Sequence, residues 1–227
     1  MLRSGTTGRR FGLAVAAAAL VAMVCAGISL AASDPIVAGP ADSFSASTYN
    51  ADQGSFVQFQ NNGGSHNVTA RQPGPDGKAL FRSATTSGGA VPVDGTQYLT
   101  SSDYPFFCTV HPTTMNGTLH VTGAGTPQAR PSATLTVRTK TISKAVKKGL
   151  LISVDASTAI NDATLTAKLG KATIAKTTGS LASGPQTKKL KLTKAGKSKL
   201  RGKGKATVKV SADIPFGSPA TAKAKLK

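Results

Sequence analysis

Residues 104–117, YPFFCTVHPTTMNG, decide the fold and the chemistry of this 227-residue chain. They read as a strand, a proline-containing loop and the start of a second strand. The stretch holds a thiol at Cys108, an imidazole at His111 and a thioether at Met115. Soft sulfur and imidazole ligands suit copper better than magnesium, calcium or manganese, whose sites favour oxygen. The stretch therefore predicts three ligands of a copper site.

A fourth ligand must come from elsewhere, because a blue-copper site needs two imidazoles, one thiolate and a weak axial sulfur. The chain has three histidines, His66, His111 and His120. His66 begins an alternating run and shares a face with its apolar residues, so its ring is expected to point inward. His120 lies between Leu119 and Val121 and therefore on the opposite face, where we expect it to be solvated. The pattern favours His66.

Residues 41–122 resemble a cupredoxin of the plastocyanin/pseudoazurin type. That family carries an HN pair, then a Cys-x-x-His, a short spacer, a Met, a Gly and a final strand. The resemblance implies a Greek-key β-sandwich with one mononuclear copper that cycles between Cu(I) and Cu(II). It implies that Asn67 ties the two ligand loops together and that His111 is the surface port for electrons. The matching ligands in this chain are His66, Cys108, His111 and Met115.

The same residues have structural interpretations. A free Cys is often an unreactive buried side chain, and Met115 could be an ordinary core methionine. The chain has two cysteines, Cys25 and Cys108, and Cys25 lies in the segment that we interpret as an export signal. A cleaved chain would keep one thiol without an intramolecular partner, which calls for an explanation. Metal ligation by Cys108 supplies one.

Residues 1–32 read as a secretory signal, with a positive head, a long apolar run and small residues for cleavage. A retained anchor helix is the alternative, because the run is long enough to span a bilayer. We expect an exported protein, secreted or held in the periplasm or cell envelope. Residues 33–40 are predicted to be a short tether.

The remaining chain predicts an all-β protein of two domains. Frequent turns between short strands favour an antiparallel sandwich for residues 41–122. Residues 123–132 contain Gly and Pro and are predicted to be a linker. Residues 133–227 show about seven alternating strands, such as one with Val208 and Val210 on one face and Lys209 on the other. This second region resembles the basic immunoglobulin-like or fibronectin-like modules of exported bacterial proteins.

Charge separates the two regions. Residues 33–124 carry three basic and six acidic residues, whereas residues 125–227 carry 22 basic and three acidic residues. Such a positive field attracts polyanions, and for an exported protein these are cell-envelope polymers or lipid headgroups. Nucleic acid is disfavoured, because Phe216 is the one aromatic residue of the basic region. Alternatively, the lysines only solvate the outer strand faces and discourage edge pairing.

The function predicted from the sequence is electron transfer by a monomer with an unidentified redox partner. Two other classes remain open, a protein that holds or delivers copper and an envelope-binding structural protein. An enzyme is not expected. Three histidines cannot furnish the clusters of a multicopper oxidase, and the chain has no Glu and no evident Ser/His/Asp grouping.

Overall fold

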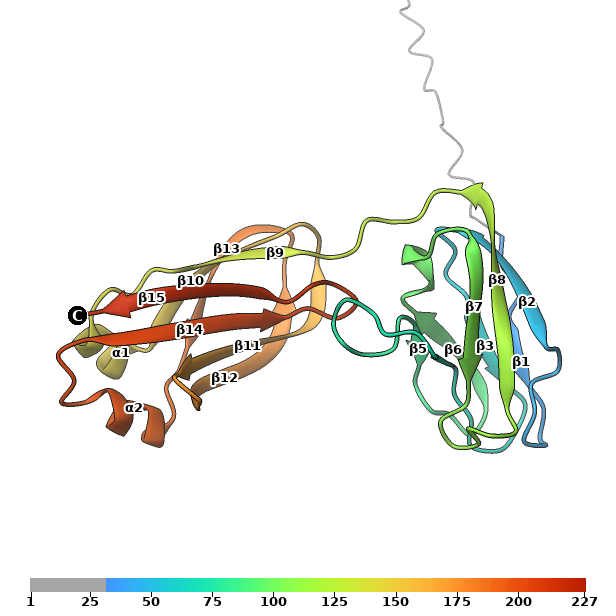
Figure 1. The fold of residues 1–227 in the computed structure, drawn as a ribbon, viewed down its shortest axis with the longest axis horizontal. Helices are drawn as coiled ribbons and strands as arrows, with labels where there is room; N and C mark the ends of the chain where they lie inside the picture. Colours follow the sequence, from blue (N-terminus) through green and yellow to red (C-terminus); the bar gives the residue numbers. More distant parts are fainter. Residues whose placement is uncertain (1–31) are drawn as a thin grey trace, which may run out of the picture.

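The structure is a computed structural model that describes residues 32–227. The expected signal segment, apart from its last residue, lies outside this range. None of the helices described is both long enough and apolar enough to cross a bilayer. The described chain forms two β domains joined by an extended segment (Figure 1).

An eight-stranded sheet with the order β1-β3-β6-β5-β4-β7-β8-β2 forms the N-terminal domain. Strand β6 pairs with β3 through its first residues and with β5 through its last, so the sheet turns at β6 into a second layer. Both layers contribute to one hydrophobic core. The elements are β1 (Ile36–Ala38), β2 (Thr48–Gln53), β3 (Gln58–Asn61), β4 (Thr69–Ala70), β5 (Arg82–Ser83), β6 (Gly89–Asp94), the 3-10 helix η1 (Thr96–Tyr98), β7 (Ser102–Phe107) and β8 (Asn116–Gly125).

The predicted tether at residues 33–40 is wrong, because this segment contains β1. Strand β1 runs parallel to β3, with Ile36 opposite Phe59, and both Ile36 and Ala38 are fully buried. A three-residue strand is too short to show an alternating pattern, and its partner is more than twenty residues away. The domain also extends past residue 122, since β8 continues to Gly125.

Phe106 of β7 lies at the centre of the first core. Its ring meets those of Phe44, Tyr49 and Phe81, with centroids 4.9, 6.2 and 6.4 Å apart. Gly117 of β8 lies opposite Phe106, and a Cβ there would come within 2.6 Å of the ring. Glycine therefore lets the ring lie against β8, next to the loop that carries Cys108.

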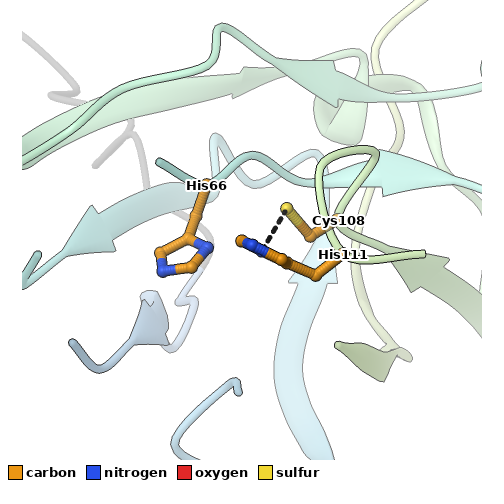
Figure 2. A group of neighbouring side chains, drawn as sticks. All are labelled: His66, Cys108 and His111. Carbon is orange, nitrogen blue, oxygen red and sulfur yellow. Dashed lines mark hydrogen bonds between the residues drawn. The ribbon is translucent and has the colours of Figure 1, made fainter. Parts of the chain in front are cut away.

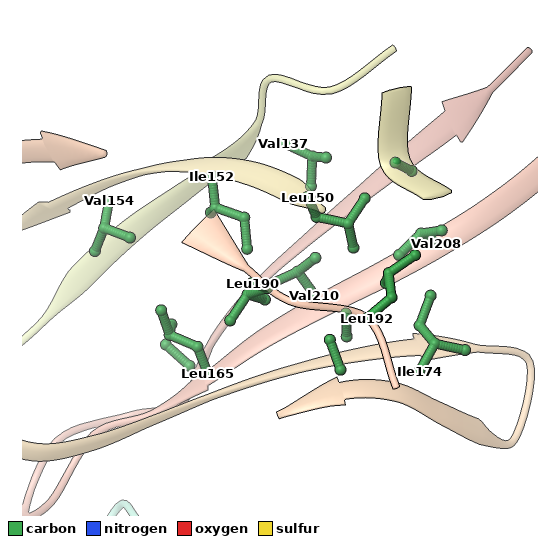
Figure 3. Packing of buried hydrophobic residues seen from close by; sticks show 14 of the residues in the cluster. Val137, Leu150, Ile152, Val154, Leu165, Ile174, Leu190, Leu192, Val208 and Val210 are labelled. Carbon is green, nitrogen blue, oxygen red and sulfur yellow. The ribbon is translucent and has the colours of Figure 1, made fainter. Parts of the chain in front are cut away.

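Two further sheets make up the C-terminal domain and share one core (Figure 3). One has the order β13-β10-β9 and the other the order β12-β11-β14-β15. The alternation predicted for β14 is confirmed, with Val208 and Val210 buried and Lys209 exposed. The strands are β9 (Ala133–Val137), β10 (Leu150–Ala156), β11 (Ile160–Leu169), β12 (Ala172–Leu181), β13 (Gly184–Leu190), β14 (Ala206–Asp213) and β15 (Ala220–Leu226).

The C-terminal domain also has two seven-residue helices, α1 (Ile142–Lys148) and α2 (Lys194–Leu200). Each begins after a threonine whose side chain caps it. The Thr141 hydroxyl accepts a hydrogen bond from the Lys144 N–H, and the Thr193 hydroxyl accepts one from the Gly196 N–H. The all-β prediction is confirmed, with these short helices as its only helical additions besides η1 in the described chain.

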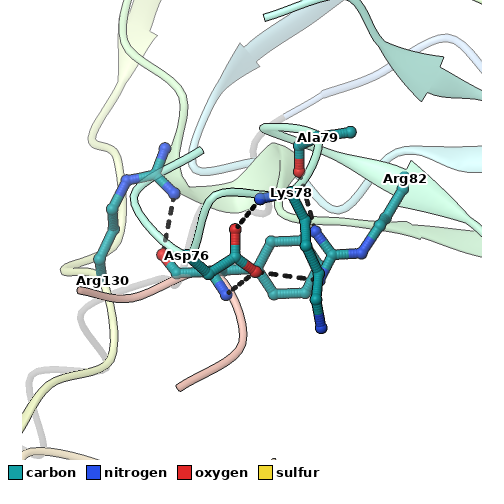
Figure 4. A network of polar contacts seen from close by, with 6 residues as sticks. Asp76, Lys78, Ala79, Arg82 and Arg130 are labelled. Carbon is teal, nitrogen blue, oxygen red and sulfur yellow. Dashed lines mark hydrogen bonds and ion pairs between the residues drawn. The ribbon is translucent and has the colours of Figure 1, made fainter. Parts of the chain in front are cut away.

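A polar network around Asp76, Arg82 and Arg130 (Figure 4) joins the two domains through contacts with Phe216. The Phe216 N–H donates to Asp76 Oδ2 at 3.1 Å, and Arg130 donates to the Phe216 carbonyl at 3.1 Å. The Arg82 guanidinium pairs with Asp76 and lies 4.1 Å from the centroid of the Phe216 ring. Burial raises the pKa of Asp76, but hydrogen bonds from the Phe216 and Lys78 N–H groups and from Arg82 outweigh it and hold this pKa below its usual value.

Candidate metal centre

Cys108 follows β7 and begins a tight loop that returns to β8. The Cys108 N–H donates to the Met115 carbonyl at 3.1 Å, and the Met115 N–H donates to the His111 carbonyl at 3.0 Å. Pro112, Thr113 and Thr114 lie between His111 and Met115 and complete the loop. The loop therefore holds Cys108, His111 and Met115 next to one another.

His66 comes from a separate segment that the backbone fixes against Thr86. Their backbones exchange two hydrogen bonds of 3.1 and 3.0 Å. The buried Asn61 side chain braces the preceding turn by donating to the carbonyls of Gly64 and Thr86. Gly64 adopts a φ of +76°, and a Cβ there would lie 2.5 Å from His66 Nε2. The position therefore needs a glycine both for its backbone and for the imidazole.

The side chains of His66, Cys108 and His111 converge. One donor atom from each lies within 4.8 Å of the others. The sulfur of Cys108 is 4.0 Å from His111 Nδ1, and the two imidazole centroids are 5.0 Å apart at an angle of 57° (Figure 2). Donors bound to one ion at bond lengths of about 2.0–2.3 Å, as in zinc sites, lie roughly 3.3–4 Å apart in a tetrahedral or trigonal set. The Cys108–His111 pair already has this spacing, and the nitrogen of His66 would move inward by up to about 1 Å to share a metal ion with them.

Both ring nitrogens of His66 are buried and have no hydrogen-bond partner, and the residue is 0% exposed. An unpaired buried polar atom costs about 1–3 kcal/mol, so such atoms are rare without a ligand. Figure 2 shows one nitrogen of this ring turned toward Cys108 and His111. A metal bound there would satisfy that nitrogen. Together with a thiol and a second imidazole, this orphaned atom fits a soft metal such as copper.

Asn67 links the two ligand-bearing segments. Its backbone N–H donates to the sulfur of Cys108 at 3.4 Å. Its side-chain oxygen accepts from the Thr109 N–H at 2.9 Å, and its amide nitrogen donates to the hydroxyls of Thr109 and Thr85. The tie between ligand loops that the sequence resemblance implies is therefore present.

Asp42 is a member of the site that the sequence did not indicate. It lies in the loop between β1 and β2, and its Oδ1 is 3.2 Å from His111 Nε2. A carboxylate at this distance favours a proton on Nε2 and so leaves Nδ1, the nitrogen that faces Cys108, as the lone-pair donor. No sequence pattern marks a single aspartate so far from the histidine along the chain.

Met115 and His120 occupy different environments. Met115 is fully buried directly after the ligand loop, next to Cys108 through its backbone. His120 is on the outer face of β8, where its Nδ1 lies 2.6 Å from Asp103 Oδ1. The structure thus places His120 apart from the cluster, as the strand periodicity indicates.

No family model matches this sequence, and no curated protein sequence matches it. Among solved structures, the chain is similar to auracyanin A, a blue copper protein from the green thermophilic photosynthetic bacterium Chloroflexus aurantiacus. The identity is 19%, the TM-score is 0.31, and the match covers 39% of this chain and 99% of auracyanin A.

A reduced mutant of amicyanin is 24% identical with a TM-score of 0.31, over 38% of this chain and 81% of its own. A 1.5-MDa bacterial ice-binding adhesin, described in terms of its host cell surface retention, is 15% identical with a TM-score of 0.26. That match covers 88% of this chain and 64% of the adhesin chain. At such low similarity, the assignment of the site depends on the side chains of this chain itself.

Proposed function

We propose that this chain is an exported blue-copper protein that carries single electrons between redox partners. The observation that carries the proposal is the convergence of His66, Cys108 and His111, with donor atoms within 4.8 Å and the His66 nitrogens left unpaired. His66, Cys108, His111 and, as the weak axial ligand, Met115 would hold one mononuclear copper.

Bound copper would supply a one-electron couple between Cu(I) and Cu(II). The chain's contribution is a fixed ligand set. His66 is buried and anchored through its backbone to Thr86, and Cys108 receives the Asn67 N–H. Because the ligands are held before any metal arrives, little rearrangement would accompany a change of oxidation state. Phe106 and the surrounding aromatic core exclude water from the inner side of the site.

Electrons would enter and leave at His111. Its side chain is 24% exposed, whereas His66 is 0% exposed. Val110 beside it is one of the few large apolar residues exposed in the described chain, and the rest of this loop is Pro and Thr. A loop without charged side chains around one exposed ligand, with Val110 exposed beside it, suits brief docking of a redox protein. Asp42 adds a single negative charge next to this loop.

The proposal extends to features that accompany the site. We infer a non-enzymatic monomer located outside the cytoplasm, either secreted or in the cell envelope. The C-terminal domain is proposed to be an immunoglobulin-like module, on the basis of its seven strands in sheets of three and four around one core.

The test is the visible spectrum of residues 32–227 after addition of Cu(II). We expect an intense blue thiolate-to-copper band in the wild type and no such band in Cys108→Ser. His120→Ala is the matched control, since it removes a histidine outside the cluster and should keep the full band. A colourless wild-type complex with bound copper would refute the blue-copper assignment.

A second measurement separates electron transfer from copper storage. Voltammetry of the copper-loaded protein should give a reversible one-electron couple, because the ligand set is rigid in both states. Loss of copper on reduction would instead indicate a protein that holds or delivers the metal.

A further inference from the structure

Acidic and basic residues are distributed unevenly along the length of the C-terminal domain. Its three acidic residues all lie at the end nearest the N-terminal domain. Asp155 pairs with Thr134 at the start of β9, and Asp213 ends β14 just before Phe216. Asp162 lines a cavity of about 500 Å³ together with Lys78 and Arg82 of the N-terminal domain. The opposite end, with α1, α2 and the C-terminus, is free of acidic residues (Figure 1).

Two adjoining grooves occupy that opposite end and share the segment 201–203. One, of about 800 Å³, lies between the β11–β12 turn and the start of β14. The other, of about 370 Å³, lies against α1 and the C-terminal residue. We refer to the pair as the distal basic groove. Its cationic residues are Lys147, Lys199, Arg201, Lys203, Lys205 and Lys227.

Helix α2 contributes Lys199 to one side of the distal basic groove. Helix α2 packs directly on β12, because Gly196 lets its backbone approach Ile174, where a Cβ would lie 2.5 Å from the carbonyl oxygen. Its first turn is capped by Thr193, and the Arg201 N–H closes the helix on the Lys197 carbonyl. Lys199 lies within this helix, and Arg201, Lys203 and Lys205 follow it in the loop that leads to β14.

None of these cations forms an ion pair with another residue of the range that the structure describes. The three ion pairs of residues 32–227 all lie in the N-terminal domain. The adjoining sheet adds to the repulsion, since Lys209 lies directly opposite Lys168 on one side and Lys223 on the other. Like charges directly opposite one another on neighbouring strands are destabilising. An external polyanion would relieve this repulsion and neutralise the groove.

We propose that the distal basic groove binds a linear, phosphate-bearing polyanion. The six cations line two adjoining shallow depressions that share residues 201–203, so one extended chain with a charge on every repeat can contact both. Arg201 pairs with phosphate in a bidentate manner, and the surrounding lysines neutralise neighbouring charges. Single-stranded nucleic acid fits less well, because Phe216, the one aromatic of this region, is engaged at the domain junction rather than free to stack on bases.

The experiment measures binding of residues 32–227 to inorganic polyphosphate by fluorescence anisotropy as a function of salt. Six neutralised charges predict an affinity that falls roughly 300-fold between 50 and 200 mM salt, from counterion release of about 0.7 per charge. The triple variant Arg201→Ser/Lys203→Ser/Lys205→Ser keeps about three of these charges and should show a fall of only about 20-fold. It should also bind more weakly at the lowest salt.

The matched control is Lys176→Ser/Lys189→Ser/Lys191→Ser, which removes the same charge from exposed positions outside the groove. It should retain the wild-type affinity and salt dependence. All six sites are exposed, and thermal unfolding verifies that both variants fold. Polyphosphate should raise the melting temperature of the wild type and of the control more than that of the groove variant.

Several outcomes would overturn the proposal. Equal loss of binding in the two triple variants would mean that diffuse charge, not the groove, attracts the polymer. Tighter binding to single-stranded DNA would indicate a nucleic-acid site. Tighter binding to poly-L-glutamate would assign the groove to a carboxylate polymer. Binding to phosphatidylglycerol vesicles without binding to polyphosphate would indicate a membrane surface.

Discussion

Replacing Asp42 with asparagine should raise the reduction potential of the bound copper. The Asp42 carboxylate is 3.2 Å from His111 Nε2, on the side of the ring opposite the proposed metal-binding nitrogen. Its negative charge stabilises Cu(II), the more positive state, more than Cu(I). Asparagine keeps an oxygen acceptor of the same shape and removes only the charge, so the variant isolates the electrostatic effect.

The expected size of the shift in potential depends on how exposed the Asp42–His111 pair is. Loss of a partner that orients a metal ligand costs about 10–100-fold in metal affinity. The Asp42 side chain is 59% exposed and therefore partly screened by solvent. We therefore expect a loss of Cu(II) affinity at the lower end of this range. A tenfold loss of Cu(II) affinity with Cu(I) affinity unchanged corresponds to 59 mV for one electron. Because Cu(I) also loses some stabilisation, we expect a rise of about 20–60 mV.

Cyclic voltammetry of copper-loaded wild type and Asp42→Asn measures the shift. The shift should shrink at high salt, since the carboxylate is near the surface. Asp103→Asn is the control, because Asp103 forms a similar aspartate–histidine pair with His120 outside the metal cluster. An unchanged or lower potential in Asp42→Asn, or an equal rise in Asp103→Asn, would refute the role assigned to Asp42.

Three further predictions concern the ligands and the domain junction. Gly64→Ala and Gly77→Ala both place a side chain at a positive φ (+76° and +74°), at a cost of about 1–2 kcal/mol in unfolding free energy. Only Gly64→Ala should also weaken Cu(II) binding, because its Cβ would contact His66. We expect a loss of affinity of about tenfold or more in a competition titration, and equal Cu(II) affinity of the two variants would contradict this. Met115→Leu preserves volume and should keep the blue band but raise the potential, because removal of a weak sulfur donor destabilises Cu(II); an unchanged potential would remove Met115 from the ligand set. The pKa of Asp76 is lowered in the folded protein, so its ionised form stabilises the fold at pH values above the ordinary Asp pKa of about 3.9. This stabilisation is lost as the pH falls through the pKa that Asp76 has in the folded protein. Asp76→Asn should therefore lower the melting temperature at pH 7 but have little effect at low pH, and a pH-independent difference would contradict the assignment.

The ligand residues could be inferred from the sequence because their signals are local. Cys108, His111 and Met115 are close along the chain, and a tight loop keeps them close in space. His66 is buried as predicted, although it lies in an isolated bridge to Thr86 and not in a regular strand, and its neighbour Asn67 is buried as well. Strands β14 and β15 of the C-terminal domain could also be predicted from the sequence, because a half-buried strand alternates apolar and charged residues over its whole length.

Contacts between distant segments could not be inferred in this way. Asp42 reaches His111 only because the loop after β1 folds over the ligand loop, and β1 itself is recognisable only through its parallel pairing with β3. Phe216 has a positive φ of 61° and meets residues of the N-terminal domain. In the sequence it is one aromatic among lysines. Periodicity reports which face of a strand is buried, but not which segment covers it.

The proposed copper site and the distal basic groove lie far apart in the molecule, so a partner bound at one site would not block the other. The copper loop precedes β8, and the segment that leads to the C-terminal domain follows it. Ten residues of strand, rising about 3.3 Å each, therefore separate His111 from the linker by roughly 30 Å. The distal basic groove is farther still, at the end of the second domain opposite the junction (Figure 1). A chain held on an anionic polymer by this groove would keep the His111 loop open to a redox partner. The Asp76–Phe216 contacts would fix the direction in which that loop faces.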